Sequence, residues 1–327
     1  MTITTPGTAK HVRPLKPTPM VSVVIPAYKV ARFIRATLDS VITQTFADYE
    51  IIVINDGSPD TEELEHQLEP YSSSIIYLTQ TNQGAGAARN AGIRAAHGEF
   101  VAFLDGDDLW LPEFLEEQLA LLTSAEGLDL VYADAANLED GRRVRMTNMD
   151  FNPSTGSVSM QSLIEGTCNV ITSTVVARRN LIVELGLFDE NFPNSQDFDL
   201  WLRIAKHGAR ISYQKKVLAL RRIYQGSLAS NPINSFRGEI AVLEKTLRRA
   251  DLTEPERVAI LRKLELRRAT VEIFRGKERL SAGEFDSALT AFRAANNHYE
   301  SWKLRLVVFW LQVAPRLLQR VYRLHAI

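Results

Sequence analysis

Cysteine is almost absent from this chain: Cys168 is the only one among 327 residues. One cysteine forms no disulfide within the chain, and such sparse use is typical of a reducing compartment. The residues around Cys168 mix polar and apolar character, which favours a structural role for this thiol over a nucleophilic one.

Long apolar runs and an excess of charge are also missing. No stretch of about 18 apolar residues occurs, so we expect no transmembrane helix. Residues 1–19 carry four prolines and three Lys or Arg residues but no apolar core, which predicts a flexible leader rather than a signal peptide. The net charge of −1 gives no bulk attraction to nucleic acid, so we expect no nucleic-acid partner.

Strand-like runs alternate with helical patterns over residues 20–230. The expected strands are 21–26, 49–54, 75–78, 100–104, 128–133, 169–177 and 211–220. The expected helices are 33–42, 62–68, 84–96, 109–122 and 197–207, whereas residues 137–160 read as loop. This alternation predicts an α/β fold with a mainly parallel sheet and flanking helices. Residues 231–327 show almost no strand signal, so we expect a helical second unit there.

Three carboxylates fall within four residues at Asp105-Gly106-Asp107-Asp108. They follow the apolar run 100–104, which reads as a buried strand. The cluster should therefore emerge at the carboxyl end of a strand, where open α/β sheets bind ligands. Like charges this close repel one another, and a hard divalent cation such as Mg²⁺ or Mn²⁺ would compensate them. On sequence alone, a solvated acidic turn that caps a helix near Leu109 explains the cluster about as well.

Three further segments should converge at the same edge of the sheet. Pro26-Ala27-Tyr28 follow the first strand, where Tyr28 could stack on a flat base or pack in the core. Asp56 follows the second strand, where its carboxylate could accept a base N–H or cap a helix. Residues 82–90 are small and open a helix, where Arg89 could hold a phosphate or a base carbonyl.

Taken together and in this order, these segments closely resemble family 2 glycosyltransferases with the GT-A fold, which is Rossmann-like. The resemblance covers about residues 20–230. It rests on the segments VSVVIPAY (21–28), NDGS (55–58), GAGAARNAG (84–92), FLDGDD (103–108) and QDFDLWLR (196–203). Each segment alone is a modest signal, whereas the ordered set is highly specific.

The resemblance implies a pocket for a nucleoside-diphosphate sugar, either UDP- or dTDP-linked. The expected lining residues are Pro26, Ala27, Tyr28, Asp56, Arg89, Asp105 and Asp107. Asp56 would read the N–H of the pyrimidine, and Arg89 would lie near the nucleotide. Asp105 would lie near the ribose, and Asp107 would reach the metal that bridges the diphosphate. Asp105 and Asp107 are therefore the candidate ligands of Mn²⁺ or Mg²⁺.

The resemblance also implies that Asp197 is the catalytic base. The acceptor hydroxyl is a poor nucleophile, so a carboxylate must take its proton as the new bond forms. One base and in-line attack at the anomeric carbon give inversion of configuration. Asp197 also opens a predicted helix, and a carboxylate in that place needs no catalytic role. Asp199, on the same turn, is a weaker candidate for the base.

Two positions depart from the family pattern. Asn55 stands where many members have a first Asp, although the second, Asp56, is present. Tyr224 stands where many relatives have a His near the end of the catalytic domain. If that His helps to hold the metal or the diphosphate, this chain should bind metal more weakly, or Arg222 should neutralise phosphate charge directly.

The C-terminal region suggests two further alternatives. Residues 283–295 resemble the second helix of a tetratricopeptide hairpin, although an ordinary helical pair is the better interpretation of one copy. Residues 301–327 carry five basic side chains, no acidic ones, and several aromatic residues. This pattern favours a helix lying on an anionic membrane surface, kinked at Pro315. The alternative is a C-terminal helix buried against the catalytic domain.

The sequence thus predicts a leader over 1–19, a GT-A domain over 20–230 and a helical region over 231–327. The expected activity is inverting, metal-dependent transfer of a sugar to a saccharide or lipid-linked acceptor in surface polysaccharide biosynthesis. The enzyme would be cytoplasmic and peripheral on the inner face of the membrane. A catalytically silent nucleotide-binding scaffold and a sugar-nucleotide nucleotidyltransferase are the alternatives. Nucleotidyltransferases usually carry a basic, Gly-rich loop directly after the first strand, and this chain has no such loop there.

Overall fold

The structure is a computed structural model that describes residues 18–124, 127–139, 141–224 and 232–325. Contacts divide the chain into two compact units, which are described separately. One comprises Met1–Pro193 and Asp199–Tyr224, and the other comprises Asn194–Phe198 and Gln225–Ile327. The predicted leader lies, up to residue 17, outside the described residues, and so does the predicted boundary near residue 230.

A nine-stranded sheet forms the centre of the first unit, with the order β3-β2-β1-β4-β8-β6-β9-β5 and with β7 paired to β6. Its first four strands are β1 (Val21–Ala27), β2 (Tyr49–Asp56), β3 (Ile75–Gln80) and β4 (Phe100–Phe103). These strands are mutually parallel. Every residue of β2 and β4 is buried, as expected for apolar runs covered on both faces. The predicted α/β fold is thus confirmed.

The other half of the sheet is mixed. Its strands are β5 (Leu109–Trp110), β6 (Leu130–Glu139), β7 (Arg142–Thr147), β8 (Val176–Arg178) and β9 (Ile211–Ile223). β8 runs antiparallel to both β4 and β6, whereas β6 and β9 are parallel. Leu109–Trp110 pair with β9, so the helix predicted from residue 109 begins instead at Phe114. β7 lies in the segment 137–160, which was predicted to be loop. The strand was missed because its arginines face solvent, so its sequence shows no alternation of apolar and polar residues.

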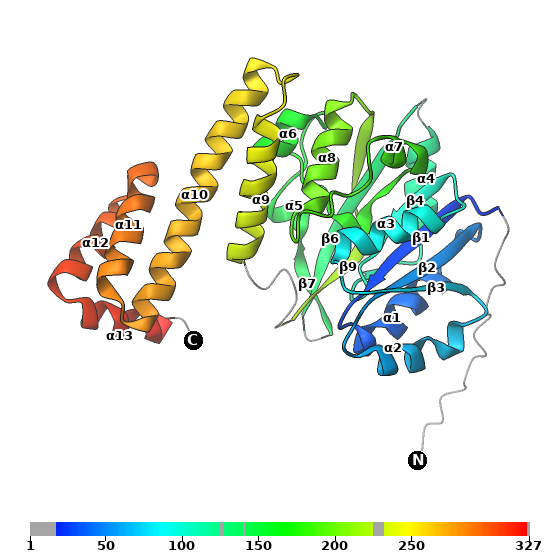
Figure 1. Cartoon of the computed structure of the whole chain (residues 1–327), viewed down its shortest axis with the longest axis horizontal. Helices are drawn as coiled ribbons and strands as arrows, with labels where there is room; N and C mark the ends of the chain where they lie inside the picture. Colours follow the sequence, from blue (N-terminus) through cyan, green and yellow to red (C-terminus); the bar gives the residue numbers. More distant parts are fainter. Residues whose placement is uncertain (1–17, 125–126, 140, 225–231, 326–327) are drawn as a thin grey trace, which may run out of the picture. The chain divides into compact units, whose positions relative to one another are not determined.

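Helices flank the sheet of the first unit (Figure 1). They are α1 (Ala31–Ile42), α2 (Thr61–Leu68), α3 (Ala85–Ala95), α4 (Phe114–Ser124), α5 (Asn148–Phe151), α6 (Met160–Glu165), α7 (Arg179–Glu184) and α8 (Gln196–Lys206). Short 3₁₀ turns occur at Glu69–Tyr71 and Thr172–Thr174. Helix α3 packs directly on β1 and β2, so the segment that carries Arg89 is fixed against the parallel strands.

The second unit is helical. It contains α9 (Pro232–Leu247), α10 (Glu254–Ala282), α11 (Phe285–Tyr299), α12 (Trp302–Val313) and α13 (Pro315–His325). Gly283 ends α10 in the left-handed region at φ 83°, which lets α11 fold back along it. With 29 residues, α10 nearly fills the roughly 34 residues of a whole tetratricopeptide repeat. An ordinary helical packing therefore describes this unit better. No helix within the described ranges is long and apolar enough to cross a membrane.

Helix α3 approaches the sheet closely at Gly92. A Cβ atom added there would lie 2.5 Å from Cγ1 of Val24 and 2.8 Å from Cδ1 of Ile54. The two strands below are buried and close-packed, so the methyl group has no free space.

We therefore expect Gly92→Ala to lower the free energy of unfolding by about 1–3 kcal/mol, because overpacking displaces α3 or the strands. Urea unfolding of the purified protein measures this. At an open helical position the same change would raise stability by about 1 kcal/mol. A variant as stable as the parent would contradict the close approach.

Candidate active site

The carboxyl ends of three parallel strands bring most of the predicted site residues to one edge of the sheet. Ala27, at the end of β1, pairs with Asn55 of β2, so Tyr28 and Asp56 leave neighbouring strands side by side. The N–H of Leu104 bonds to the carbonyl of Val24 (3.2 Å), so the chain after β4 leaves the sheet next to β1. The acidic quartet, residues 105–108, therefore leaves the sheet at the same edge, next to the strand of Tyr28, with Asp56 on the strand beyond it.

The quartet is held against β1 and α1 through its backbone. The hydroxyl of Thr37 lies 3.0 Å from the carbonyl oxygen of Gly106 and 2.9 Å from that of Asp108. A Cβ atom at Gly106 would lie 2.8 Å from the carbonyl oxygen of Pro26, so only glycine fits without displacing the end of β1. Thus Pro26 faces the quartet through its backbone, whereas the side chain of Ala27 belongs to the core.

Asp105 forms an ion pair with Arg89 of α3, with Nη2 and Oδ1 2.5 Å apart. Arg89 is buried, and its guanidinium also lies 5.5 Å from the centre of the Phe188 ring. Among the residues that the structure describes, its Nε and Nη1 atoms are buried without a hydrogen-bond partner. The carboxylate of Asp105 is therefore the one close anion that balances this buried cation in the described part of the chain.

Asp107 accepts a hydrogen bond from the hydroxyl of Tyr224 (2.9 Å). Its backbone carbonyl accepts a second from Nε of Arg222 (2.8 Å). Burial and the nearby charge of Asp105 raise the pKa of the Asp107 carboxyl. Tyr224, predicted to stand at the family's His position, thus contacts the quartet directly through a neutral O–H.

Asp108 is buried and accepts hydrogen bonds from the Ser173 hydroxyl (2.7 Å) and the Arg222 N–H (2.9 Å). Burial, followed by the charges of Asp105 and Asp107, raises the pKa of Asp108 to about 7. Ser173 lies in the 3₁₀ turn Thr172–Thr174, where the sequence predicted only β-structure.

A cationic and aromatic cluster lies next to Asp107. The rings of Phe33 and Tyr224 are 4.8 Å apart. The guanidinium of Arg32 lies 4.4 Å from the Phe33 ring and 4.8 Å from the Tyr224 ring. Arg222 lies 4.6 Å from the Phe33 ring. The sequence analysis did not select Arg32, because one arginine at the start of a helix carries no motif.

The carboxylates fit a divalent cation that is shared with substrate. No group of three His, Cys, Asp or Glu side chains that could hold a metal occurs within the described ranges. Asp105 and Asp107 offer hard oxygen atoms at the end of a strand, and Mg²⁺ and Mn²⁺ often use one or two carboxylates completed by substrate phosphates and water. Burial, and after it the charge of Asp105, raises the pKa of Asp107, and a nearby positive charge would favour its ionised form. The two residues therefore suit such an ion.

Asp56 is buried, and its carboxylate organises the loop before α3. It accepts hydrogen bonds from the Gln80 side chain (2.8 Å) and from the N–H groups of Gln83 (2.9 Å) and Gly84 (2.8 Å). Asp56 therefore stabilises the loop before α3 and does not act as the N-cap of α2, which was its alternative role. Reading of a base N–H by Asp56 stays a prediction. Tyr28 is 42% exposed, so its ring is free to stack on a ligand and does not pack in the core.

Asp197 opens α8, where its Oδ1 atom accepts the N–H of Phe198 (2.8 Å). It lies in the segment Asn194–Phe198, which groups with the second unit. Asp199 is instead buried and paired with Nε of Arg203 (2.8 Å). This ion pair gives Asp199 a structural role and weakens it further as a candidate base.

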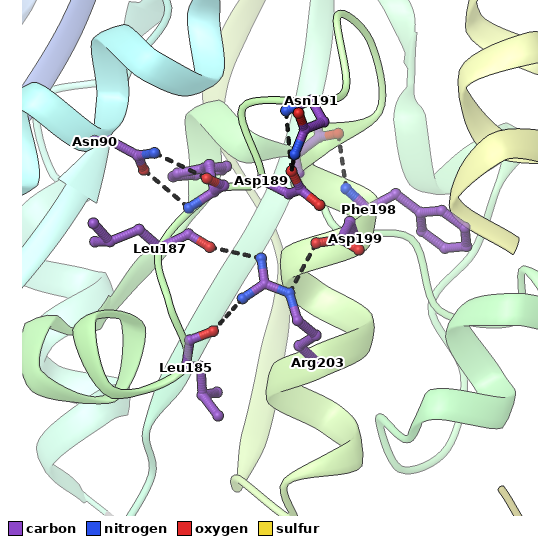
Figure 2. A network of polar contacts seen from close by, with 10 residues as sticks. Asn90, Leu185, Leu187, Asp189, Asn191, Phe198, Asp199 and Arg203 are labelled. Atoms are coloured by element: carbon purple, nitrogen blue, oxygen red, sulfur yellow. Dashed lines mark hydrogen bonds and ion pairs between the residues drawn. The ribbon is translucent and has the colours of Figure 1, made fainter. Parts of the chain in front are cut away.

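Arg203 fixes the loop that leads into α8 (Figure 2). Its guanidinium donates to the carbonyl oxygens of Leu185 and Leu187, while Asn90 of α3 exchanges two hydrogen bonds with the backbone of Phe188. The ring of Trp201, on α8, lies 6.3 Å from that of Phe103 at the end of β4. Asn90 and Arg203 lie within the motifs 84–92 and 196–203, but no role could be predicted for them from the sequence.

The chain is similar to a known protein family, to curated sequences and to solved structures. The family described as Glycosyl transferase family 2 matches residues 22–186. An uncharacterized glycosyltransferase of Rickettsia felis is 31% identical over 244 residues, which cover 73% of this chain and 40% of the relative. The Escherichia coli UDP-Glc:alpha-D-GlcNAc-diphosphoundecaprenol beta-1,3-glucosyltransferase WfgD is 29% identical over 230 residues, covering 68% of this chain and 85% of the relative. The chain spans 40% and 39% of the length of two Rickettsia relatives.

Two solved structures share the fold. TarS 1–349 of S. aureus, in complex with UDP-GlcNAc, has a TM-score of 0.61 at 20% identity and covers 93% of this chain and 92% of its own. The mannosyltransferase PcManGT from Pyrobaculum calidifontis, in complex with GDP-Man and Mn²⁺, has a TM-score of 0.62 at 17% identity. That alignment covers 97% of this chain and 91% of PcManGT. At these identities the likeness concerns the fold.

The raised pKa of Asp108 predicts a pH-dependent stability. Between its ordinary value of 3.8 and about 7, the folded protein keeps a proton that the unfolded chain has released, so the free energy of unfolding falls as pH rises. Asp108→Asn removes this dependence. We expect the stability of the parent relative to the variant to drop by about 2 kcal/mol between roughly pH 5 and pH 8, by urea unfolding in a chelator.

Asp286→Asn, on an exposed turn of α11, is the control for loss of a carboxylate, and it should follow the parent at both pH values. An Asp108→Asn curve parallel to the parent would show that the Asp108 carboxyl titrates normally in the folded protein.

Proposed function

The chain belongs to glycosyl transferase family 2, and on that premise we propose that it transfers a sugar, with inversion, from a UDP- or dTDP-sugar to a hydroxyl group. The observation that carries the proposal is the convergence of Tyr28, Asp56 and the acidic quartet at the carboxyl edge of the parallel strands. Ligands of open α/β sheets bind at this edge. The UDP-GlcNAc bound by TarS supports a nucleoside-diphosphate sugar as donor.

The residues of the edge suit the parts of such a donor. The exposed ring of Tyr28 offers a face on which the base can stack. Asp105 and Asp107 would hold Mn²⁺ or Mg²⁺, and the Mn²⁺ in the PcManGT complex supports that choice. A divalent cation supplies charge stabilisation for a departing diphosphate. Arg222 and Arg32 lie beside Asp107 and would add positive charge on the same side.

Asp197 would act as the base that takes the proton of the acceptor hydroxyl. The start of a helix favours a charged carboxylate, and an ionised carboxylate can accept that proton as the hydroxyl attacks the anomeric carbon. Because a single base assists an in-line attack, the configuration at the anomeric carbon inverts. Asp199 leaves this role open to Asp197, since Arg203 pairs with it.

The acceptor would be a saccharide, carried on a lipid diphosphate, that becomes part of a surface polysaccharide. The name of WfgD describes transfer to a GlcNAc-diphosphoundecaprenol acceptor, which supports this class. Such an acceptor stays in a membrane, so the enzyme would work in the cytoplasm at the inner membrane face. Loops and turns within residues 137–180 would form the acceptor side.

A silent nucleotide-binding scaffold is a second candidate, because both candidate metal ligands already have partners in the protein. Arg89 pairs with Asp105, and Tyr224 bonds to Asp107. If these contacts persist in solution, a donor would bind without its metal and without reaction. The family match leaves no support for the nucleotidyltransferase alternative.

Donor binding separates these candidates. We expect one pyrimidine-diphosphate sugar, at about 100 times its dissociation constant, to raise Tm by roughly 5 °C with Mn²⁺ present, and clearly less in a chelator. Asp107→Asn should remove the Mn²⁺-dependent part while the protein stays folded, because it removes a carboxyl whose pKa is already raised. The same donor shift with and without Mn²⁺ would favour the scaffold.

Catalysis by Asp197 is tested with an isosteric change. Asp197→Asn should lower kcat by about 10³-fold or more, because the acceptor proton has no recipient, while the donor-induced shift of Tm remains. Asp286→Asn is a matched control, since Asp286 also lies in the first turn of a helix. Transfer by Asp197→Asn at the parent rate would remove Asp197 from the mechanism.

A further inference from the structure

Helix α12 has two apolar faces. Leu304, Val307, Val308 and Leu311 lie on one side and pack with Phe292 of α11 in the small core of the second unit. This face makes α12 a structural part of the helical unit. The alternative predicted for this segment was burial against the catalytic domain, whereas the packing seen here is on helices of the second unit itself.

The opposite face of α12 is also apolar, but it is exposed. Trp302, Leu306, Phe309 and Val313 recur at spacings of four, three and four residues, which places them in one row along the helix. Trp302 is 69% exposed, Phe309 53% and Val313 63%. Leu317 and Val321 of α13, also exposed, are four residues apart on that helix. These six residues are called the outer stripe.

The two helices are held together as one piece. Pro315 begins α13, and the backbone at Ala314 leaves helical geometry, so the chain bends there. Leu318 and Tyr322 of α13 pack on the same small core as α12. Gln319 also donates a hydrogen bond to the carbonyl oxygen of Ser281 at the end of α10 (3.1 Å). The outer stripe is therefore carried by a supported helix pair.

Basic side chains accompany the outer stripe. At about 100° per residue, Lys303 and Arg305 lie on either side of the row on α12. Arg316 and Arg320 lie next to Leu317 on α13. All four are exposed, and none of the ion pairs among the described residues involves them. Residues 301–327 contain no Asp or Glu, so the charged side chains that α12 and α13 themselves carry have one sign.

We propose that the outer stripe docks this protein on an anionic lipid bilayer, with α12 and α13 lying in the interface. Helices of 12 and 11 residues are too short to span a bilayer but suit a position along its surface. Exposed Trp302 and Trp310 suit the headgroup level. Charge complementarity selects anionic lipid as the occupant, because a second copy of this surface would meet it with the same positive charge.

The inference rests on the proposed function only for the purpose of membrane binding, since a lipid-linked acceptor would lie in the same membrane. Binding of lipid is measured without sugar transfer. A failed transfer assay and a failed vesicle assay therefore refute different proposals, and Asp197→Asn should bind vesicles as the parent does.

The test is co-sedimentation of the full chain with vesicles that contain about one third anionic lipid. The parent should pellet, and Phe309→Gln with Val313→Gln should weaken partition by roughly tenfold or more, because both side chains lose their apolar contact with lipid. Leu261→Gln is the matched control, since Leu261 is an equally apolar, exposed residue of α10 outside the stripe. It should bind as the parent does, and circular dichroism checks that each variant is folded.

The charges are tested separately. Arg316→Gln with Arg320→Gln should weaken binding to anionic vesicles by roughly tenfold and leave the weaker binding to zwitterionic vesicles unchanged. No pelleting of the folded parent would overturn the proposal, and so would equal pelleting of the Phe309 and Val313 variant. A dimer in lipid-free solution that this variant converts to monomer, with no vesicle binding by the parent, would assign the stripe to a second copy.

Discussion

Repulsion among the three carboxylates of the quartet is the constraint on which the rest of the site depends. The fold answers each charge differently: Asp105 pairs with Arg89, Asp107 accepts the O–H of Tyr224, and Asp108 is buried with hydrogen-bond donors around it. Burial, and after it the charge of the neighbouring carboxylates, raises the pKa of Asp107 and Asp108. A cation bound between these side chains would stabilise their ionised forms. The free energy that would favour metal binding is therefore the cost of keeping buried carboxylates close together, which the contacts above only reduce.

The partners of the quartet also explain how strand ends that are far apart in the sequence become one site. Arg222 lies at the end of strand β9, and Tyr224 directly follows that strand. The quartet lies between β4 and β5, and β5 pairs with β9. The contact between Tyr224 and Asp107 is thus a consequence of sheet order. A neutral phenol at this position can orient Asp107 without binding metal, so under the proposed function Arg222 and Arg32 would supply positive charge near a donor diphosphate. Weaker metal binding by this chain, which the sequence suggested, stays a prediction.

Local sequence was sufficient for the parallel half of the sheet and for the place of the quartet. The runs that form β1, β2 and β4 are apolar and buried, so a strand pattern and the position of the residues that follow it could be read directly. In the mixed half, the predicted strands 128–133 and 211–220 correspond to β6 and β9, and the predicted strand 169–177 overlaps the three residues of β8. β5 and β7 were missed, because β5 has only two residues and β7 carries exposed arginines. Ser173, Thr37 and Arg32 were missed for a related reason: each acts through a contact with a distant segment and carries no motif.

The C-terminal helices show how one apolar pattern can supply apolar side chains to two sides of a helix. Periodicity in residues 302–313 could mean packing or exposure to lipid, and the basic and aromatic side chains of residues 301–327 favoured lipid. In the structure the helix is apolar on opposite sides, so its inner row completes the core with Phe292 and Leu280 while its outer row stays exposed. Packing of the inner row also orders the helix before any lipid is present. Lipid binding would then cost little conformational entropy, which is the advantage that a preformed amphipathic surface has over one that folds on contact.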